Sequence, residues 1–291
     1  MSAGRLAPTP SGDLHLGNVT AFAAAWLSAR QAGTPLLLRM EDVDTGRARP
    51  EVEARQRATL QWLGLDWDRE TPRQSERRYD SALEKLGDLA YRCECSRRAI
   101  RAADGRCGMG CADKPLTHGA LRLRTDDTVV AFTDRRHGPQ RIASGVQGDP
   151  VLVRSDGLVA YPLAVVVDDV RDGVSEVVRG DDLLQFTAPQ LLLWHALGGV
   201  PPTWCHTPLV LGPDGRKLGK SHGSISVDAL RDTGWAREHI LRCVLGWLGC
   251  PTPHLHEAVA HFDPALIPTG SVQITSGVNV PPDALTWMLC R

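Results

Sequence analysis

Two short segments far apart in the sequence, 15–18 and 217–221, carry residue types suited to chemistry on phosphate. The first follows the turn-forming stretch 8–12 and opens an apolar run over 19–27, which predicts a helix. His15, Gly17 and Asn18 would then lie at the helix N-terminus, where unpaired backbone N–H groups and the positive dipole end favour phosphate. Because Gly17 has no Cβ, a ring or ribose could approach the backbone there.

The second segment places Lys217 and Lys220 on a glycine-flanked loop. Cations on a mobile loop can close over a triphosphate while charge develops in phosphoryl-type chemistry. Either segment alone is a weak indication, since a lone histidine is often incidental to a helix entrance and two lysines usually belong to a solvated loop. Their order and separation favour the joint interpretation of a nucleotide site.

Four of the eight cysteines lie close together, at Cys93, Cys95, Cys107 and Cys111. This spacing fits four thiolates around one tetrahedral zinc ion. The alternative is a scatter of buried thiols, but the segment is polar and glycine-rich, with little core to bury them. Four protein ligands would leave no open position, so the zinc would be structural, one per chain. Binding of order ~10–16 kcal/mol could fold the segment. The remaining cysteines (Cys205, Cys243, Cys250, Cys290) are too dispersed for a site.

Arginines surround this cysteine cluster. They are either solvated residues around a metal knuckle or a patch that contacts nucleic-acid phosphates, and the sequence leaves both interpretations open. They stand at Arg92, Arg97, Arg98, Arg101 and Arg106.

Composition limits the class of protein. The 291 residues have a formal net charge of −1, which excludes a globally basic nucleic-acid binder but allows a local basic patch. The first residues lack a signal-peptide apolar core and no run of eighteen apolar residues occurs, so we expect a cytoplasmic protein without membrane contact. Cysteines in that setting indicate metal ligands or free thiols before disulfides.

Apolar runs and breakers along the chain predict alternating strands and helices. We expect strands over 36–40, 162–167 and 175–178, with a turn over 168–173 between the last two. We expect helices over 51–63, 79–90, 189–197 and 235–248. Such alternation predicts an α/β protein with a doubly wound parallel sheet and its site at the carboxyl ends of the strands.

Five further segments support a family resemblance: 5–17, 38–44 (Leu-Arg-Met-Glu-Asp-Val-Asp), 74–79, 156–169 and 176–182. With the two lysines and the histidine segment, they resemble the class I aminoacyl-tRNA synthetases, in particular the glutamyl-tRNA synthetases. The resemblance covers residues 4 to 225 and is closest to the small paralogue family that glutamylates queuosine in tRNA(Asp). The short region after Ser221 favours this paralogue, because it is expected to be too small for an anticodon-binding domain.

The resemblance implies a division of the chain. Residues 1–92 and 151–225 would form the two halves of the nucleotide-binding catalytic domain, and 93–150 an inserted zinc-binding subdomain. Residues 226–291 would form a short helical C-terminal region.

The resemblance also implies residue roles. Arg5, Ala7, Ser11, Glu41, Tyr161 and Arg179 would bind glutamate. Within that set, Glu41 would pair with the α-ammonium group, and Arg179 would clamp a carboxylate through two hydrogen bonds. His15, Gly17, Asn18 and Lys220 would bind ATP with its magnesium ion. His15, Asn18, Lys217 and Lys220 would be catalytic.

Two departures from the family pattern stand out. The family has a zinc site in this region but often places tyrosine where Cys107 stands. Gly219 replaces the usual serine between the lysines, and activity is expected to survive that change.

The implied reaction is ATP-dependent formation of glutamyl-adenylate, followed by transfer of glutamate to the diol of queuosine at the wobble position of tRNA(Asp). Catalysis would consist of positioning and charge stabilisation by a monomeric enzyme. Two alternatives stay open: a truncated glutamyl-tRNA synthetase that charges the 3′ end of tRNA(Glu), and a non-catalytic tRNA-binding paralogue. The intact His15, Asn18 and lysines argue against the second.

Overall fold

A computed structural model describes residues 2–107, 109–126, 128–218 and 226–274. The predictions made for Gly219, Lys220, Ser221 and Cys290 therefore lie outside the described residues.

The central sheet joins two sets of strands. Parallel strands β1, β2 and β3 form one set, and β9, β10 and β6 are parallel in the other, with β7 antiparallel at its edge. A parallel bridge between Ala3 and Val174 connects them, so the spatial order is β3-β2-β1-β9-β10-β6-β7. The bounds are β1 Gly4–Leu6, β2 Leu36–Leu38, β3 Arg69–Glu70, β6 Val129–Asp134, β7 Gly138–Ala143, β9 Glu176–Gly180 and β10 Thr203–Thr207.

Helices cover both faces of this sheet, as the sequence predicts. Leu36 and Leu38 enter one core with α1 and α8, whereas Leu37 enters the other with α5 and α6. Successive side chains of a strand point to opposite faces, so a continuous leucine run serves a strand that is buried on both sides. These helices are α1 (Leu16–Ala32), α2 (Pro50–Leu63), α3 (Asp80–Leu86), α5 (Tyr161–Asp172), α6 (Thr187–Ala196) and α8 (Arg237–Trp247). The α/β class with parallel strand pairing is confirmed.

The strand predicted over 162–167 is wrong, and so is most of the turn predicted over 168–173. Both belong to helix α5, which has Pro162 in its first turn and ends at Gly173 in a left-handed conformation with φ of 71°. A short buried run of valines cannot be assigned to strand or helix by periodicity alone. The proline at the start and the glycine at the end were the signals that favoured a helix.

The helix predicted over 79–90 is too long. Helix α3 ends at Leu86, Gly87 adopts a φ of 46°, and Ala90–Cys93 becomes strand β4. The other predicted helices and the strands at 36–40 and 175–178 agree with α2, α6, α8, β2 and β9 to within a few residues.

The segment from 93 to 150 contributes to two sheets. β4, β5 (Ala120–Leu123) and β8 (Val151–Val153) form a small antiparallel sheet next to helix α4 (Arg97–Ala102), while the β6–β7 hairpin extends the central sheet. Short 3-10 helices cover Gln74–Glu76, Gly87–Leu89, Cys111–Asp113, Asp181–Phe186 and Pro264–Leu266. The four-part division of the chain stays a prediction.

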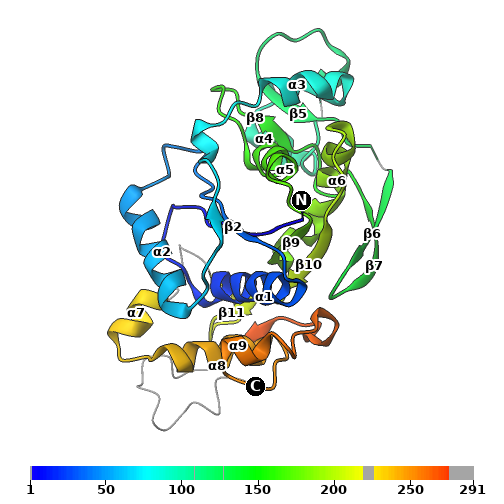
Figure 1. Cartoon of the computed structure of the whole chain (residues 1–291). Helices are drawn as coiled ribbons and strands as arrows, with labels where there is room; N and C mark the ends of the chain where they lie inside the picture. Colours follow the sequence, from blue (N-terminus) through cyan, green and yellow to red (C-terminus); the bar gives the residue numbers. More distant parts are fainter. Residues whose placement is uncertain (1, 108, 127, 219–225, 275–291) are drawn as a thin grey trace.

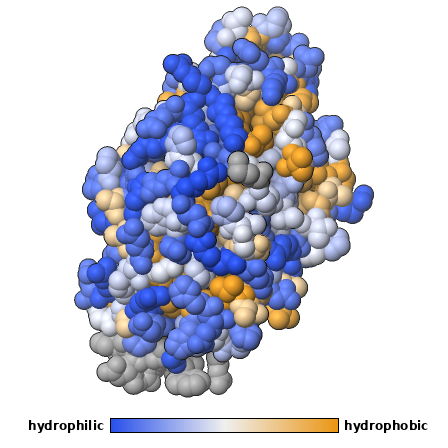
Figure 2. Space-filling model, viewed as in Figure 1, coloured by the Kyte–Doolittle hydropathy of each residue, from blue (hydrophilic) through white to orange (hydrophobic). Residues whose placement is uncertain are grey.

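The C-terminal helices lie at the opposite end of the molecule from β5, β8 and α4 (Figure 1). They are α7 (Val227–Asp232), α8 and α9 (Leu255–Ala258), and α8 packs against α1. Strand β12 (Val272–Gln273) pairs with β11 (Val210–Leu211), which fastens this region to the segment before Lys217. Hydrophilic residues cover most of the face drawn in Figure 2. Among the described helices, none is long and apolar enough to cross a membrane.

Candidate active site and cysteine cluster

A cavity of about 340 Å³ lies at the carboxyl ends of β1 and β9, where the strand order reverses. Open α/β sheets bind ligands at this topological switch point. The structure brings nine of the residues named from the sequence into its lining: Arg5, Ala7, His15, Gly17, Asn18, Glu41, Tyr161, Arg179 and Lys217. Ser11 belongs to the same loop but is not among the lining residues, and Lys220 lies outside the described residues.

The N-terminus of α1 forms the nucleotide end of the cavity. His15 Nδ1 accepts a hydrogen bond from the Asn18 backbone N–H at 3.3 Å, and Asn18 Oδ1 accepts from the His15 N–H at 3.1 Å. Because Nδ1 is an acceptor, a neutral His15 ring carries its hydrogen on Nε2, a donor suited to phosphate. A Cβ at Gly17 would lie 3.1 Å from this ring, so the glycine leaves the ring in place.

The opposite end of the cavity rests on a buried charge network. Arg5 donates from Nε to Asp169 Oδ1 at 3.3 Å and from Nη1 to the Val178 carbonyl at 3.1 Å. The fully buried Arg39 lies 2.7 Å from Asp169 and 3.3 Å from Glu41. Sequence reasoning missed both Arg39 and Asp169. Arg39 stands inside the Leu-Arg-Met-Glu segment, and Asp169 falls where a turn was expected instead of helix α5.

The anionic forms of Glu41 and Tyr161 are electrostatically unfavourable in this cavity. Burial raises the pKa of Glu41 despite the attraction of Arg39 and Arg5. Burial also raises the pKa of Tyr161, and the nearby Glu41 adds to the effect. A cationic ligand would stabilise the ionised Glu41, so this end of the cavity is suited to an ammonium group.

The Arg179 guanidinium is buried among neutral acceptors. Four of its N–H groups donate, at 2.6–3.1 Å, to His206 Nε2, Gln190 Oε1, the Leu183 carbonyl and Thr187 Oγ1. Its central carbon lies 4.8 Å from the centre of a Trp204 ring. In the described part of the chain no carboxylate pairs with Arg179, and burial lowers its pKa. Tyr161, through a side-chain hydrogen bond, and Asp169, through its charge, oppose this shift. A buried cation with no carboxylate in contact attracts an anionic ligand, but the guanidinium does not keep two N–H groups for the two-hydrogen-bond clamp that the resemblance implies.

Lys217 pairs with a second residue of the cavity wall. Its Nζ donates to Asp182 Oδ2 at 2.5 Å, and both side chains are partly exposed. Asp182 belongs to the 176–182 segment noted in the sequence but was given no role there. The pair places a carboxylate and an ammonium group together in the wall of the cavity.

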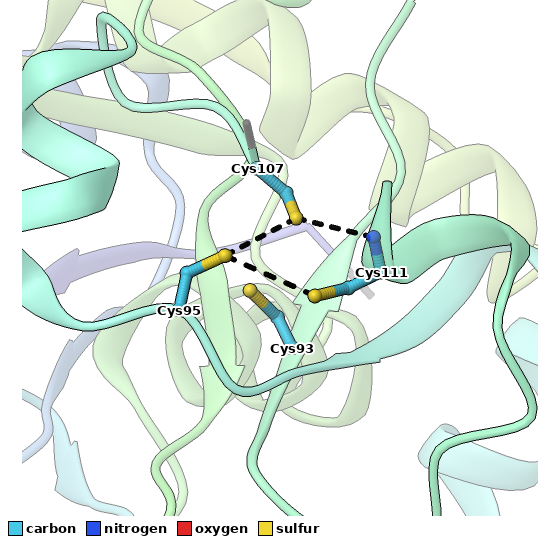
Figure 3. A group of neighbouring side chains, drawn as sticks. All are labelled: Cys93, Cys95, Cys107 and Cys111. Carbon is cyan, nitrogen blue, oxygen red and sulfur yellow. Dashed lines mark hydrogen bonds between the residues drawn. The ribbon is translucent and has the colours of Figure 1, made fainter. Parts of the chain in front are cut away.

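The four cysteines converge in a separate cluster beside the β4–β5–β8 sheet (Figure 3). All four Sγ atoms lie within 4.8 Å of one another, and Cys95 Sγ is 3.4 Å from Cys107 Sγ and 3.8 Å from Cys111 Sγ. Sulfurs around a tetrahedral zinc ion are about 3.8 Å apart, given Zn–S bonds of about 2.3 Å. The cluster could hold one zinc ion.

Local structure supports this geometry. The Cys111 backbone N–H donates to Cys107 Sγ at 3.3 Å, an outer contact of the kind that orients metal ligands. Gly119 has a φ of 95°, and a Cβ there would come within 2.5 Å of the Cys93 carbonyl oxygen. Burial and the neighbouring thiols raise the pKa of Cys95 to about 12. Thiols packed in this way ionise far more readily around a divalent cation.

The surrounding arginines separate into two groups. Arg92 and Arg106 donate to the carbonyls of Gly119 and Gly145 and so hold loops of the segment together. Arg97, Arg98 and Arg101 are exposed on α4. Only the exposed group has the accessibility that a phosphate-contacting patch requires.

Comparisons with known proteins agree with this geometry. The family model described as tRNA synthetases class I (E and Q), catalytic domain, matches residues 3–115 and 112–275. A protein of Symbiobacterium thermophilum named glutamyl-Q tRNA(Asp) synthetase is 41% identical over 312 residues, covering 94% of this chain and 96% of the relative. One of the same name from Nocardia farcinica is 43% identical over 287 residues, covering 91% of each. The crystal structure of a glutamate-tRNA synthetase from Elizabethkingia anophelis is similar in fold, with a TM-score of 0.78 at 24% identity, covering 96% of this chain and 69% of that one.

Proposed function

Because the chain belongs to the class I tRNA synthetases of the E and Q type, and among them to the glutamyl-Q tRNA(Asp) synthetases, we propose that it activates L-glutamate with ATP and transfers it to queuosine in tRNA(Asp). The observation that carries the proposal is that one cavity is lined both by Arg179, a buried cation that no described carboxylate contacts, and by the buried carboxylate of Glu41. Glutamate offers the complementary groups, two carboxylates and an ammonium.

In the first step an oxygen of the glutamate α-carboxylate attacks the α-phosphorus of ATP. A P–O bond forms, the bond to the β-phosphate breaks, and pyrophosphate leaves. The positive charges of Arg179 and Arg5 attract one glutamate carboxylate, and Glu41 accepts from the ammonium group. Magnesium bound with ATP would neutralise phosphate charge.

The nucleotide end of the cavity stabilises the phosphates. The backbone N–H groups of the first turn of α1, the His15 ring and Lys217 supply donors and positive charge where negative charge develops. We propose the same role for Lys220. Catalysis then rests on positioning and electrostatics without a covalent intermediate on the protein.

In the second step a hydroxyl of the queuosine diol attacks the carbonyl carbon of glutamyl-adenylate. An ester forms, the bond to the phosphate oxygen breaks, and AMP leaves. The exposed arginines of α4 (Arg97, Arg98, Arg101) are placed on the protein surface, where they could contact backbone phosphates of the tRNA.

We propose that Cys93, Cys95, Cys107 and Cys111 hold one structural zinc ion. The donor set fills all four positions of a tetrahedral site, so the ion would stabilise the segment and supply no chemistry to the reaction. The monomeric state and the cytoplasmic location stay predictions.

The decisive experiment locates the glutamate. Pyrophosphate exchange should depend on glutamate and ATP, proceed without tRNA and fail with aspartate. Labelled glutamate should then remain with the anticodon fragment of queuosine-containing tRNA(Asp) after ribonuclease digestion, and unmodified transcript should be inert. Label on the 3′ fragment of tRNA(Glu) would identify a minimal tRNA-charging enzyme instead, and absence of exchange would favour a non-catalytic paralogue.

A further inference from the structure

A second layer of buried residues lies behind Arg179. Its Nε donates to His206 Nε2 at 3.0 Å, and His206 stands on β10, the strand that pairs with β9. His206 Nδ1 lies 2.7 Å from Asp134 Oδ2, and both side chains are fully excluded from solvent. The three side chains form a continuous chain from the end of β6 to the wall of the cavity.

The hydrogen bonds fix the state of the imidazole. Since Arg179 Nε can only donate, His206 Nε2 must accept, and the ring hydrogen is on Nδ1, which donates to Asp134. Asp134 is fixed in turn, because its Oδ1 accepts from the backbone N–H groups of Arg136 and His137 at 3.0 Å each. Burial lowers the pKa of His206 to about 4, so the imidazole is neutral at physiological pH.

We propose that His206, held by Asp134, is a positioning residue for glutamate binding: it orients the Arg179 guanidinium without placing a carboxylate in contact with it. The inference rests on the proposed function, since it assigns His206 a role through a residue proposed to bind glutamate.

The neutrality of the acceptor is the essential feature. A carboxylate in direct contact with Arg179 would orient the guanidinium equally well, but it would cancel the charge that attracts the substrate carboxylate. The His206 imidazole is held in place by Asp134 and in turn holds Arg179. It lies between the two, so the Asp134 carboxylate does not contact the guanidinium. Gln190, the Leu183 carbonyl, Thr187 and the Tyr161 hydroxyl, which also hydrogen-bond to Arg179, are uncharged as well.

Two amide substitutions separate positioning from packing. In His206→Gln the longer amide can place an oxygen where Nε2 accepts from Arg179. In His206→Asn the shorter amide can still reach Asp134 but not Arg179. Cys205→Ala, at the preceding residue of β10 and equally buried, reports the cost of disturbing the strand alone. Glutamate-dependent pyrophosphate exchange, with KM for glutamate and for ATP measured separately, and thermal melting are the measurements.

We expect His206→Asn to raise the glutamate KM about tenfold, the effect of losing one hydrogen bond to a charged group that keeps its other partners. The ATP KM should stay within about twofold, and His206→Gln should recover the glutamate KM to within about threefold. Equal glutamate KM values in the two amide variants would overturn the inference. If His206→Asn does not fold, a large rise in glutamate KM in His206→Gln overturns it on its own. An unaltered protein without glutamate-dependent exchange would instead overturn the proposed function, which the two variants do not decide.

Discussion

The cavity and the cysteine cluster are assembled in opposite ways. The cavity draws Arg5, Glu41, Tyr161 and Arg179 from β1, the segment after β2, α5 and β9, so it exists only when the central sheet is complete. The cysteine cluster comes from one continuous stretch between Cys93 and Cys111. A site built from distant segments can rely on a rigid scaffold, whereas a local site must supply its own stability.

The charged groups of the cavity and the thiols of the cysteine cluster also differ in how a ligand would affect them. In the cavity burial raises the pKa of Glu41 and lowers that of Arg179, so the folded protein disfavours the charged forms that a ligand would stabilise. In the cluster the thiols can be stabilised by a metal ion. The charged residues of the cavity therefore lower the stability of the fold in order to bind a ligand. The cysteine cluster, in contrast, would gain stability when it binds a metal ion. Variants can test each half of this contrast.

The largest effect is expected at Arg179. Arg179→Ala removes the cation that no described carboxylate contacts, and the glutamate-dependent kcat/KM for pyrophosphate exchange should fall about 10³-fold. Arg141→Ala, which removes an exposed arginine on β7, is the matched control and should leave the rate unchanged. A loss smaller than tenfold at Arg179 would contradict the account of the cavity.

Glu41→Gln tests whether binding is obtained at the expense of stability. The glutamate KM should rise about 10²-fold, because the partner of the ammonium group is lost. Since the folded-state pKa of Glu41 lies above its ordinary value of 4.5, its ionisation near pH 7 opposes folding. The variant should therefore melt about 2–4 °C higher at pH 7, a shift that corresponds to about 1 kcal/mol.

Melting temperatures of the unaltered protein and of Glu41→Gln at low pH provide the control for this prediction. Below about pH 4 Glu41 is protonated in the folded and unfolded states, so the two proteins should melt at the same temperature. A variant that is less stable at pH 7 would show that the Glu41–Arg39 pair stabilises the fold, contrary to the direction inferred here.

The cysteine cluster should show the reverse pattern. Cys95→Ser should lower zinc content from one equivalent and lower the melting temperature by about 5–10 °C, because a structural metal contributes folding free energy. Glutamate-dependent exchange without tRNA should change less than twofold, since the cavity residues lie outside this segment. Cys250→Ser, at a buried thiol outside the cluster, should retain the zinc. Full zinc retention in Cys107→Ser would contradict a four-cysteine site.

The same contrast explains what the sequence could predict. The cysteine cluster was visible from spacing alone, because its members are neighbours in the chain. The cavity residues were named through a family resemblance, and their convergence required the sheet order. The supporting partners Asp169, Gln190 and His206 were missed, because nothing in their local sequence shows which side chain they reach. Helix α5 was misread for a related reason: a buried valine run has no polar face to reveal its period.

The smallest effect is expected at Asp182, where the cavity meets solvent. Its carboxylate holds Lys217 Nζ at 2.5 Å, and ATP phosphates in the cavity would compete with it for the same ammonium group. Asp182→Asn should lower the KM for ATP about two- to threefold. The limit follows from the exposure of the pair, 49% for Lys217 and 38% for Asp182, because exposed ion pairs contribute little.

Glu70→Gln supplies the control for this prediction. Glu70 is 44% exposed and forms an ion pair with Arg57, but it does not line the cavity. Glu70→Gln should therefore leave the KM for ATP unchanged. Added salt should reduce the advantage of Asp182→Asn, since it weakens the competing pair in the unaltered protein. A rise of tenfold or more in the KM for ATP would contradict this prediction. It would mean that Asp182 itself helps to bind ATP or its magnesium ion, although it lies at the exposed edge of the cavity.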